Sequence, residues 1–266
     1  MQVEDGRGEG GETRPGEAPG RPELVPCRAV PWRAPLGWLR RGWQDFRAAP
    51  ALSLGAGVVI ALVSMGVAAL AWHLGRLALL AALLSGFVFV APLLAAGLYC
   101  VSRSLELGRP PRLSASLALA RRVVGQAGVF AIVQLVILLL WARAGMVVNV
   151  FFPVHAGDLA ALAEFLLIGS AVGAVFAALT FASAAFSLPL IADRDVDMIT
   201  AALSSIRAVL RNKPAALVWA GLIVAFTLLG FATAFLGLVL VMPWLAYAAW
   251  HGYREVMDAE AWPRLE

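Results

Sequence analysis

Residues 51–73 read ALSLGAGVVIALVSMGVAALAWH, a stretch without a single Asp, Glu, Lys or Arg. A helix needs about 20 apolar residues to cross the hydrocarbon core of a bilayer, and this stretch is long enough. Backbone polar groups must be satisfied within the protein in lipid, so only helices and closed barrels span membranes. The apolar residues are continuous rather than alternating, which favours a helix over a barrel strand.

Similar apolar runs recur along the chain, which is 61% hydrophobic, whereas soluble domains are about 45–50% apolar. They predict an all-α, polytopic membrane bundle with spans at 51–73, 77–101, 123–147, 162–190, 215–233 and 236–254. Residues 215–250 carry no charge, and only Gly230 and Gly237 mark a possible turn between the last two runs. One bent helix over 215–254 is therefore the alternative to two spans.

The distribution of Arg and Lys predicts the orientation of these spans. They number six in residues 21–50, five in 101–122, four in 192–214 and two after 250, whereas the predicted outer loops carry only Arg76 and Arg143. Basic residues are enriched in cytoplasmic loops, so we expect a multi-pass membrane protein with both termini in the cytoplasm. This topology accounts for the net charge of +4 without nucleic-acid binding, because no soluble module with a clustered basic face is present.

Polar segments flank the membrane domain, which we place at residues 36–257. Residues 1–35 are rich in Gly, Pro, Glu and Arg and bury too little apolar surface to offset the entropy of ordering. We expect them to form a disordered cytoplasmic tail, with residues 258–266 as a second, short tail. No cleavable signal peptide is visible, so the first apolar run is interpreted as a retained signal anchor.

Three amphipathic segments precede the first helix of each predicted hairpin, at 36–47, 113–124 and 196–210. Their apolar residues recur every three or four positions, which is typical of helices lying at the lipid headgroups, although 113–124 is the weaker case. The second helices share the sequences Pro92-Leu-Leu-Ala95, Pro189-Leu-Ile-Ala192 and Pro243-Trp-Leu-Ala246. We interpret the chain as three parallel helical-hairpin repeats; the alternative is generic membrane chemistry without repetition.

Two groups of residues are candidates for a functional site. Gly169, Gly173 and Ala177 lie four apart on the predicted fourth span, a spacing that allows helices to approach closely within the bundle or in a dimer. A possible cation or phosphate site at the inner face combines charged and aromatic residues: Asp193, Arg194, Asp195, Asp197, Trp250, His251, Tyr253 and Arg254. The simpler interpretation is that Asp195 or Asp197 caps the following helix.

The sequence contains no pattern that indicates an enzyme, a metal or a cofactor. Nucleophile elbows, His-Glu-x-x-His helices and P-loops are absent. Of the three histidines, His73 and His155 are predicted on the outer side and His251 on the inner side, which disfavours a haem or metal site. No charged residue lies at mid-membrane depth in the predicted spans, which argues against an ion-coupled transporter.

Four motifs carry a resemblance to a known family: PLLAAGLYCVSRSLELG at 92–108, SLPLIADRDVD at 187–197, NKP at 212–214 and WHGYR at 250–254. Over roughly residues 36–257 the chain resembles the bacterial predicted integral membrane proteins grouped as domain of unknown function 2189. The resemblance implies a location in the bacterial inner membrane and a helical membrane architecture, but the family has no established activity. Some relatives are described as candidate cytochrome c oxidase components, although three histidines are too few for the catalytic subunit.

These observations lead to two expectations about function. The first is a non-enzymatic accessory, assembly or scaffold component of a membrane complex, with a respiratory oxidase as one candidate partner. The alternative is a transporter or lipid-handling protein with a cavity between the repeats. In both cases the expected surroundings are the lipid bilayer, with no nucleic acid and no cofactor.

Overall fold

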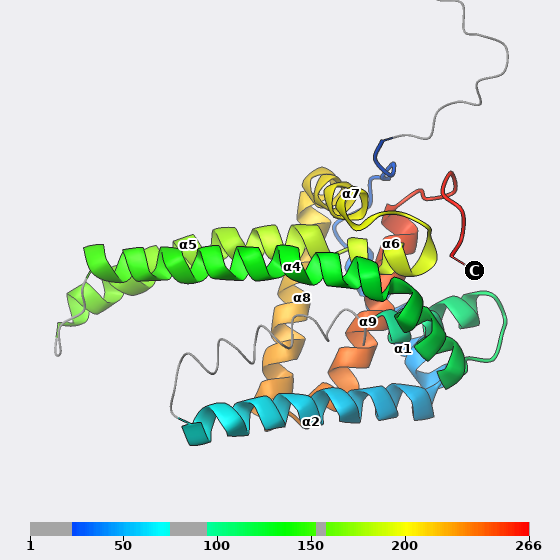
Figure 1. Cartoon of the computed structure of the whole chain (residues 1–266), viewed down its shortest axis with the longest axis horizontal. Coiled ribbons are helices and arrows are strands. Elements are labelled where there is room, and N and C mark those ends of the chain that lie inside the picture. The colour runs from blue at the N-terminus through cyan, green and yellow to red at the C-terminus, as the bar shows by residue number, and fades with distance from the viewer. Residues whose placement is uncertain (1–22, 75–94, 153–157, 266) are drawn as a thin grey trace, which may run out of the picture.

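The computed structural model describes residues 23–74, 95–152 and 158–265, and its regular elements there are helices (Figure 1). A helix without a label covers residues 95–106. The labelled helices are α1 (Ala34–Ala48), α2 (Pro50–Leu74), α4 (Leu113–Phe151), α5 (Leu159–Ala184), α6 (Ser187–Asp193), α7 (Met198–Arg211), α8 (Lys213–Ala232) and α9 (Leu238–Val256). The predicted all-α class is confirmed for these residues.

Four segments of the described chain are long and apolar enough to cross a membrane: Pro50–Leu70, Leu113–Phe151, Leu159–Asp193 and Lys213–Ala232. They correspond to four of the six predicted spans. The predicted span 77–101 lies largely outside the described residues, and α9, at the place of the sixth, does not meet these criteria. The structure therefore supports a multi-pass membrane protein but does not confirm six spans or three repeats.

The second predicted interfacial segment, 113–124, is not a separate helix. It forms the beginning of α4, which continues without a break for 39 residues. At 1.5 Å per residue such a helix is about 58 Å long, well beyond the roughly 30 Å of a hydrocarbon core. The prediction was wrong at this point because its weak amphipathic pattern contained no residue that stops a helix before the apolar run.

The chain reverses direction between α8 and α9, so residues 215–254 form two helices rather than one bent helix. The backbone φ angles of Ala234 and Phe235 are +51° and +69°, in the left-handed region that reverses the chain. Gly230 and Gly237 lie on either side of this turn. Both pack closely against other residues, and a side chain on Gly230 would collide with the Leu238 side chain. The two glycines thus mark the turn without supplying its left-handed residues.

Helix α9 lies at the centre of the arrangement and packs against α1, α2, α6 and α8 (Figure 1). The α4–α5 pair runs across the direction of α8 in this view. The largest fully buried side chains include Trp38, Trp219 and Trp250. The Trp38 ring meets the Trp219 ring edge-on at a centroid distance of 5.7 Å, a favourable aromatic geometry. Trp38, Leu39 and Phe46 of α1 thus pack within the protein, whereas Leu36 and Trp43 of the same helix are exposed.

The described part of the predicted disordered tail is packed against the rest of the chain. Val25 is fully buried, and the Val30 amide donates to Asn212 Oδ1 at 2.8 Å. Cys27 and Met257 form an isolated β-bridge, and the Asp258 amide donates to the Pro26 carbonyl at 2.9 Å. Residues 23–33 and 257–265 therefore fold onto the helices, in contrast to the expectation of two tails; residues 1–22 lie outside the described chain.

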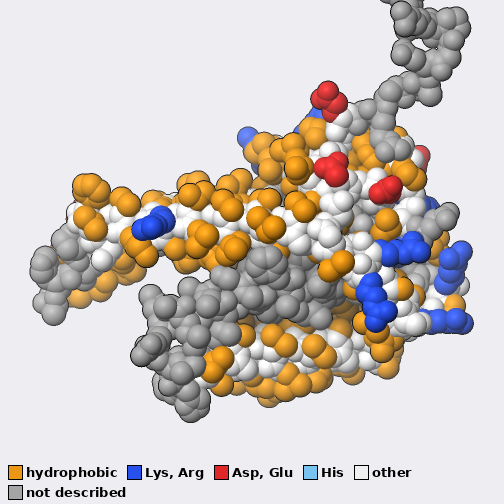
Figure 2. All heavy atoms as spheres, viewed as in Figure 1, with side chains coloured by type: hydrophobic (Ala, Val, Ile, Leu, Met, Phe, Trp, Pro, Cys, Tyr) orange, Lys and Arg blue, Asp and Glu red, His pale blue; other side chains and the backbone are white. Residues whose placement is uncertain are grey.

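The outer surface combines a broad apolar area with charges that gather at one end. Figure 2 shows apolar side chains along α2, α4 and α5, with most of the visible Lys and Arg side chains gathered at one end of the molecule. Exposed large residues include Leu139, Val150, Leu167 and Leu217. In water such continuous exposure is unfavourable, whereas in a bilayer these side chains contact lipid.

Candidate functional site

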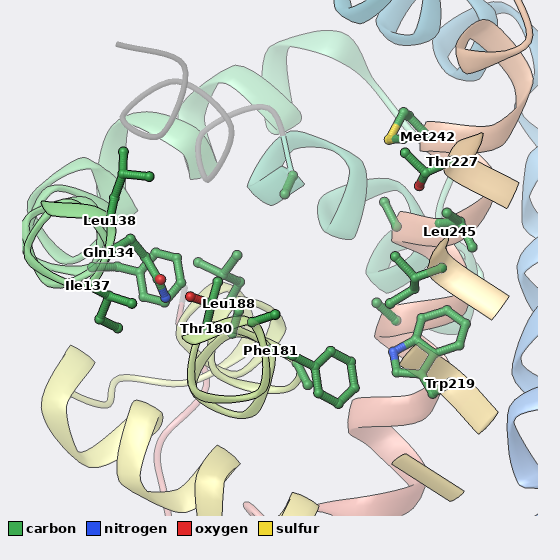
Figure 3. A pocket seen from close by; sticks show the side chains of 18 of the residues that line it. Gln134, Ile137, Leu138, Thr180, Phe181, Leu188, Trp219, Thr227, Met242 and Leu245 are labelled. Carbon is green, nitrogen blue, oxygen red and sulfur yellow. The ribbon is translucent and has the colours of Figure 1, made fainter. Parts of the chain in front are cut away.

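A large apolar cleft lies between the α4–α5 pair on one side and α8 and α9 on the other (Figure 3). Its volume is about 770 Å³, within the range of about 300–1,000 Å³ typical of small-molecule sites. Leu98 and Tyr99 of the helix at 95–106 also line it. Segments of all three predicted hairpins thus contribute to one cleft.

None of the described residues that line the cleft carries a charge. Its few polar groups include Gln134, Thr180 and Thr227, and Gln134 and Thr180 lie together on the α4–α5 side in Figure 3. Gln134 Nε2 donates to Ser183 Oγ at 3.0 Å, and Ser183 donates to the Thr180 carbonyl at 3.0 Å. This arrangement can accommodate an apolar molecule with at most a small hydrogen-bonding group.

A separate cluster of charged residues forms around Asp193, at the end of α6. The Asp193 side chain is almost fully buried and accepts from Tyr253 Oη at 2.8 Å and from Arg194 Nε at 3.1 Å. Arg103 Nε and an Arg254 guanidinium nitrogen lie 3.5 Å and 3.7 Å from its carboxylate oxygens. Three guanidinium groups and one phenol therefore surround one buried carboxylate, as a buried charge requires.

Glu106 extends this network. It accepts from Arg254 Nε at 3.0 Å and from the Trp250 indole Nε1 at 3.1 Å. The network also holds the C-terminal segment, because Arg194 donates to the Trp262 carbonyl at 2.7 Å and Arg103 to the Leu265 carbonyl at 2.6 Å. We call Arg103, Glu106, Asp193, Arg194, Tyr253 and Arg254 the Asp193 cluster. Each of the two carboxylates contacts at least one of the three guanidinium groups, and these contacts bind the ends of several helices together.

The structure divides the predicted inner-face site into parts. Asp193, Arg194, Tyr253, Arg254 and Trp250 belong to the network around Asp193. His251 points elsewhere: its Nε2 lies 2.9 Å from Asp45 Oδ2 and joins α9 to α1. Asp195 is exposed, and its backbone amide donates to the Pro263 carbonyl at 3.0 Å. The predicted residues therefore do not converge on one ligand position.

Asp197 is the N-cap of α7, as the simpler interpretation of the sequence proposed. Its side chain accepts from the Thr200 amide at 2.9 Å. Slight burial acts to raise the pKa of the Asp197 carboxyl, but hydrogen bonds from Thr200 and Ile199 outweigh it, so the pKa lies below the ordinary value of 3.8. Asp197 has a local structural role in α7.

The small residues of α5 make few tight contacts in the described chain. A side-chain carbon on Gly173 would lie 3.5 Å from Trp141 Nε1, an ordinary contact with α4. Gly169 has no other described residue within 4 Å of such a carbon, and Ala177 is exposed and lines the cleft. Closer helix contacts occur at positions that the sequence did not single out, including Gly42 and Gly57 against α9.

Sequence reasoning missed Arg103, Glu106 and Asp45 as partners in these networks. Arg103 and Glu106 lie three residues apart, so they share one face of the helix at 95–106. That pairing next to an apolar run was the available signal. Asp45 carried no comparable signal, because its partner His251 is 206 positions away in the chain. The predicted outer histidines, His73 and His155, lie among residues whose side chains the structure does not describe.

The comparison with protein families gives one match. Residues 79–193 match the model of the family described as predicted integral membrane protein (DUF2189), which confirms the resemblance over that segment. The matched segment contains α4, α5 and α6, and with them one wall of the cleft and Asp193. No curated protein and no solved structure matches the chain.

Proposed function

We propose that this multi-pass membrane protein is non-enzymatic and holds an apolar molecule, a lipid acyl chain, in the cleft between α4–α5 and α8–α9. The observation that carries the proposal is the chemistry of the cleft: a space of about 770 Å³ without a charged residue among those that line it in the described chain. A polar or ionic solute would lose its hydration there without compensation. An acyl chain has no such cost.

The driving force for binding differs from that in a soluble carrier. Lipid tails are as apolar as the cleft, so moving an acyl chain from the bilayer into the cleft gains little from the hydrophobic effect. Affinity must come from close packing and from hydrogen bonds, which are strong in a low-dielectric site. The Gln134–Ser183 pair is the best-placed polar group for selecting one lipid among many.

The test compares two neighbouring positions on α5. Ala177 lines the cleft, whereas the exposed Ala178 does not. We expect Ala177→Phe to fill part of the cleft and reduce the lipid that stays bound through purification in mild detergent. Ala178→Phe adds the same bulk to the surface and should retain the lipid. Bound lipid per protein would be measured by extraction and mass spectrometry.

Two results would contradict the proposal. One is a wild-type protein that retains no stoichiometric lipid. The other is equal lipid retention by the two Phe variants, with both variants folded as judged by thermal unfolding. A flux assay in liposomes then distinguishes a transporter of this lipid from a protein that only holds it.

The accessory or scaffold role predicted from the sequence is a second candidate, favoured by the outer surface of α5. The most hydrophobic part of this helix contains no buried residue, and Gly169 leaves open space on its surface. Another membrane helix can approach closely at such a position. Affinity purification from native membranes would identify a partner, such as an oxidase subunit. We expect Gly169→Leu to lose that partner while the fold stays intact, and retention of the partner would count against this role.

For orientation we propose an inner-membrane location with both termini in the cytoplasm, supported by the charge distribution of the sequence. Accessibility of engineered cysteines to a membrane-impermeant reagent tests this. Glu260→Cys should react only after the inner face is opened, and reaction in intact cells would reverse the proposed orientation.

A further inference from the structure

Helix α7 has two apolar faces of different kinds. The face turned toward the protein consists mainly of small residues: Ala201, Ser204, Ser205 and Ala208 are fully buried, together with the larger Met198 at the beginning of the helix. Three large apolar residues point outward: Ile199, Leu203 and Leu210 are 64%, 49% and 59% exposed. This is the reverse of a helix in a soluble protein, which buries its large apolar residues.

Hydrogen bonds hold α7 in this rotation. Ser204 Oγ accepts from the Val25 amide at 3.0 Å, and Ser205 Oγ accepts from the Phe186 amide at 3.1 Å. Ser205 also donates to the Ala182 carbonyl at 2.7 Å. Both serines lie on the small-residue face, so a roll that buried Leu203 would break all three bonds.

Both ends of α7 are tied to candidate membrane spans. The span Leu159–Asp193 ends five residues before Met198, and the span Lys213–Ala232 begins two residues after Arg211. The 14 residues of α7 extend about 21 Å at 1.5 Å per residue. Because both connections are short, α7 lies close to the membrane surface.

Basic residues border the exposed apolar face. Arg207 and Arg211 are exposed and lie four residues apart, so they are neighbours along one edge of the exposed apolar face. Lys213, two residues after Arg211, is also exposed. Among the described residues none of these three forms a salt bridge. Figure 2 shows apolar side chains over α7 with basic side chains beside them.

We infer that α7 inserts its Ile199–Leu203–Leu210 face into one leaflet of the bilayer and binds the phosphates of anionic lipids through Arg207 and Arg211. A helix with an apolar stripe bordered by Arg is suited to this position, because its side chains reach the acyl chains while its guanidinium groups stay with the headgroups. The structure separates α7 from α1 in this respect. α1 buries Trp38, Leu39 and Phe46 within the protein and exposes only Leu36 and Trp43 among its large apolar residues.

The depth of α7 is tested with the full-length chain reconstituted in phosphatidylcholine–phosphatidylglycerol vesicles. After Cys27→Ser and Cys100→Ala, a fluorophore is attached at Leu203→Cys. Leu217→Cys, exposed on the span α8, serves as the lipid-facing reference, and Glu260→Cys as the aqueous reference. We expect the Leu203 label to be quenched by nitroxide-labelled acyl chains, as at position 217, and to be protected from iodide.

Two outcomes would overturn the insertion. Quenching of the Leu203 label by iodide, as at position 260, would place this face in water. Protection from both quenchers would mean that another protein surface covers it.

The headgroup contact is tested by titrating the purified protein, in a neutral detergent, with fluorescent phosphatidylglycerol. A basic residue near an anionic lipid surface contributes about fivefold in affinity, so the double variant Arg207→Gln/Arg211→Gln should bind about 25-fold more weakly. Arg143→Gln, far from α7 on the α4 helix, is the control and should bind like the wild type. Unchanged binding by the double variant would refute the role of the two arginines.

Discussion

The contact between α1 and α9 should be disrupted by a single methyl group at Gly42. A Cβ built on Gly42 lies 2.6 Å from the Ala248 nitrogen, 3.0 Å from the Ala248 Cα and 3.0 Å from the Trp244 carbonyl oxygen. All three atoms belong to the α9 backbone, so no side-chain rotation can relieve the contact. Either α1 or α9 must move as a whole.

The expected change in the free energy of unfolding combines two opposing terms. Overpacking costs about 1–3 kcal/mol, and a rigid backbone neighbour places Gly42→Ala at the upper end of this range. Replacing Gly by Ala inside a helix gains about 1 kcal/mol. The net loss is therefore about 2 kcal/mol. Gly37, in the same helix, has no other described residue within 4 Å of its added carbon. Gly37→Ala should therefore gain the stability of Ala in a helix without the destabilisation from overpacking.

Thermal unfolding of both variants in one detergent, followed by tryptophan fluorescence, measures this difference. At about 2–4 °C per kcal/mol for a chain of this size, Gly42→Ala should lower the Tm by about 4–8 °C. Gly37→Ala should leave the Tm unchanged or raise it slightly. Equal Tm values for the two variants would show that α1 does not pack on α9 as closely as the structure has it.

Three further predictions concern individual polar contacts. Asp193→Asn should lower the free energy of unfolding by about 3–5 kcal/mol, because it leaves buried guanidinium groups without a counter-charge. Asp195 is exposed, so Asp195→Asn should change the free energy of unfolding by less than about 0.5 kcal/mol. Similar Tm values for the two variants would refute the central position of Asp193. Asp197→Ala should lower the free energy of unfolding by about 1 kcal/mol, because it removes the N-cap of α7. The folded-state pKa of Asp197 lies below 3.8, so the wild type should have its full Tm advantage over the variant above pH 3.8 and lose it as the pH falls through the folded-state pKa. A Tm advantage that persists in acid would contradict the capping role of Asp197. Tyr247→Phe and Ser53→Ala should each cost about 1–3 kcal/mol, and a double variant whose loss equals the sum of the two would argue against their 2.9 Å hydrogen bond.

The sequence predicted the kind of structure well because the bilayer imposes simple rules. Length and continuity of apolar residues were sufficient to locate three of the four described spans within a few residues, whereas the helix Leu113–Phe151 begins ten residues before the predicted span 123–147. The turn between α8 and α9 was also expected near Gly230 and Gly237. These features depend on local composition, which periodicity and charge counting can detect.

What could not be predicted depends on contacts between distant residues. The amphipathic patterns at 36–47 and 196–210 are similar, yet the two helices pack differently. α1 buries Trp38, Leu39 and Phe46, whereas α7 exposes Ile199, Leu203 and Leu210. The difference comes from their neighbours: α9 offers α1 a surface with Gly252 next to Trp38, whereas α7 meets its partners through serines. The local sequence pattern also could not predict the pairing of Asp45 with His251 or the packing of residues 23–33 against the helices.

The distribution of polar contacts bears directly on how the cleft could admit a ligand. In the described chain, hydrogen bonds connect α4 and α5 to α7. The Met198 amide of α7 donates to Gln126 Oε1 of α4, and Ser205 Oγ of α7 donates to the Ala182 carbonyl of α5. None of the side-chain hydrogen bonds found in this part of the structure joins α4 or α5 to α8 or α9. As far as the described residues are concerned, the two walls can therefore separate without breaking a side-chain hydrogen bond between them. Because the Asp193 cluster and the His251–Asp45 pair hold the opposite end of α9, an apolar molecule entering between the walls would displace van der Waals contacts alone, and its own packing can replace them.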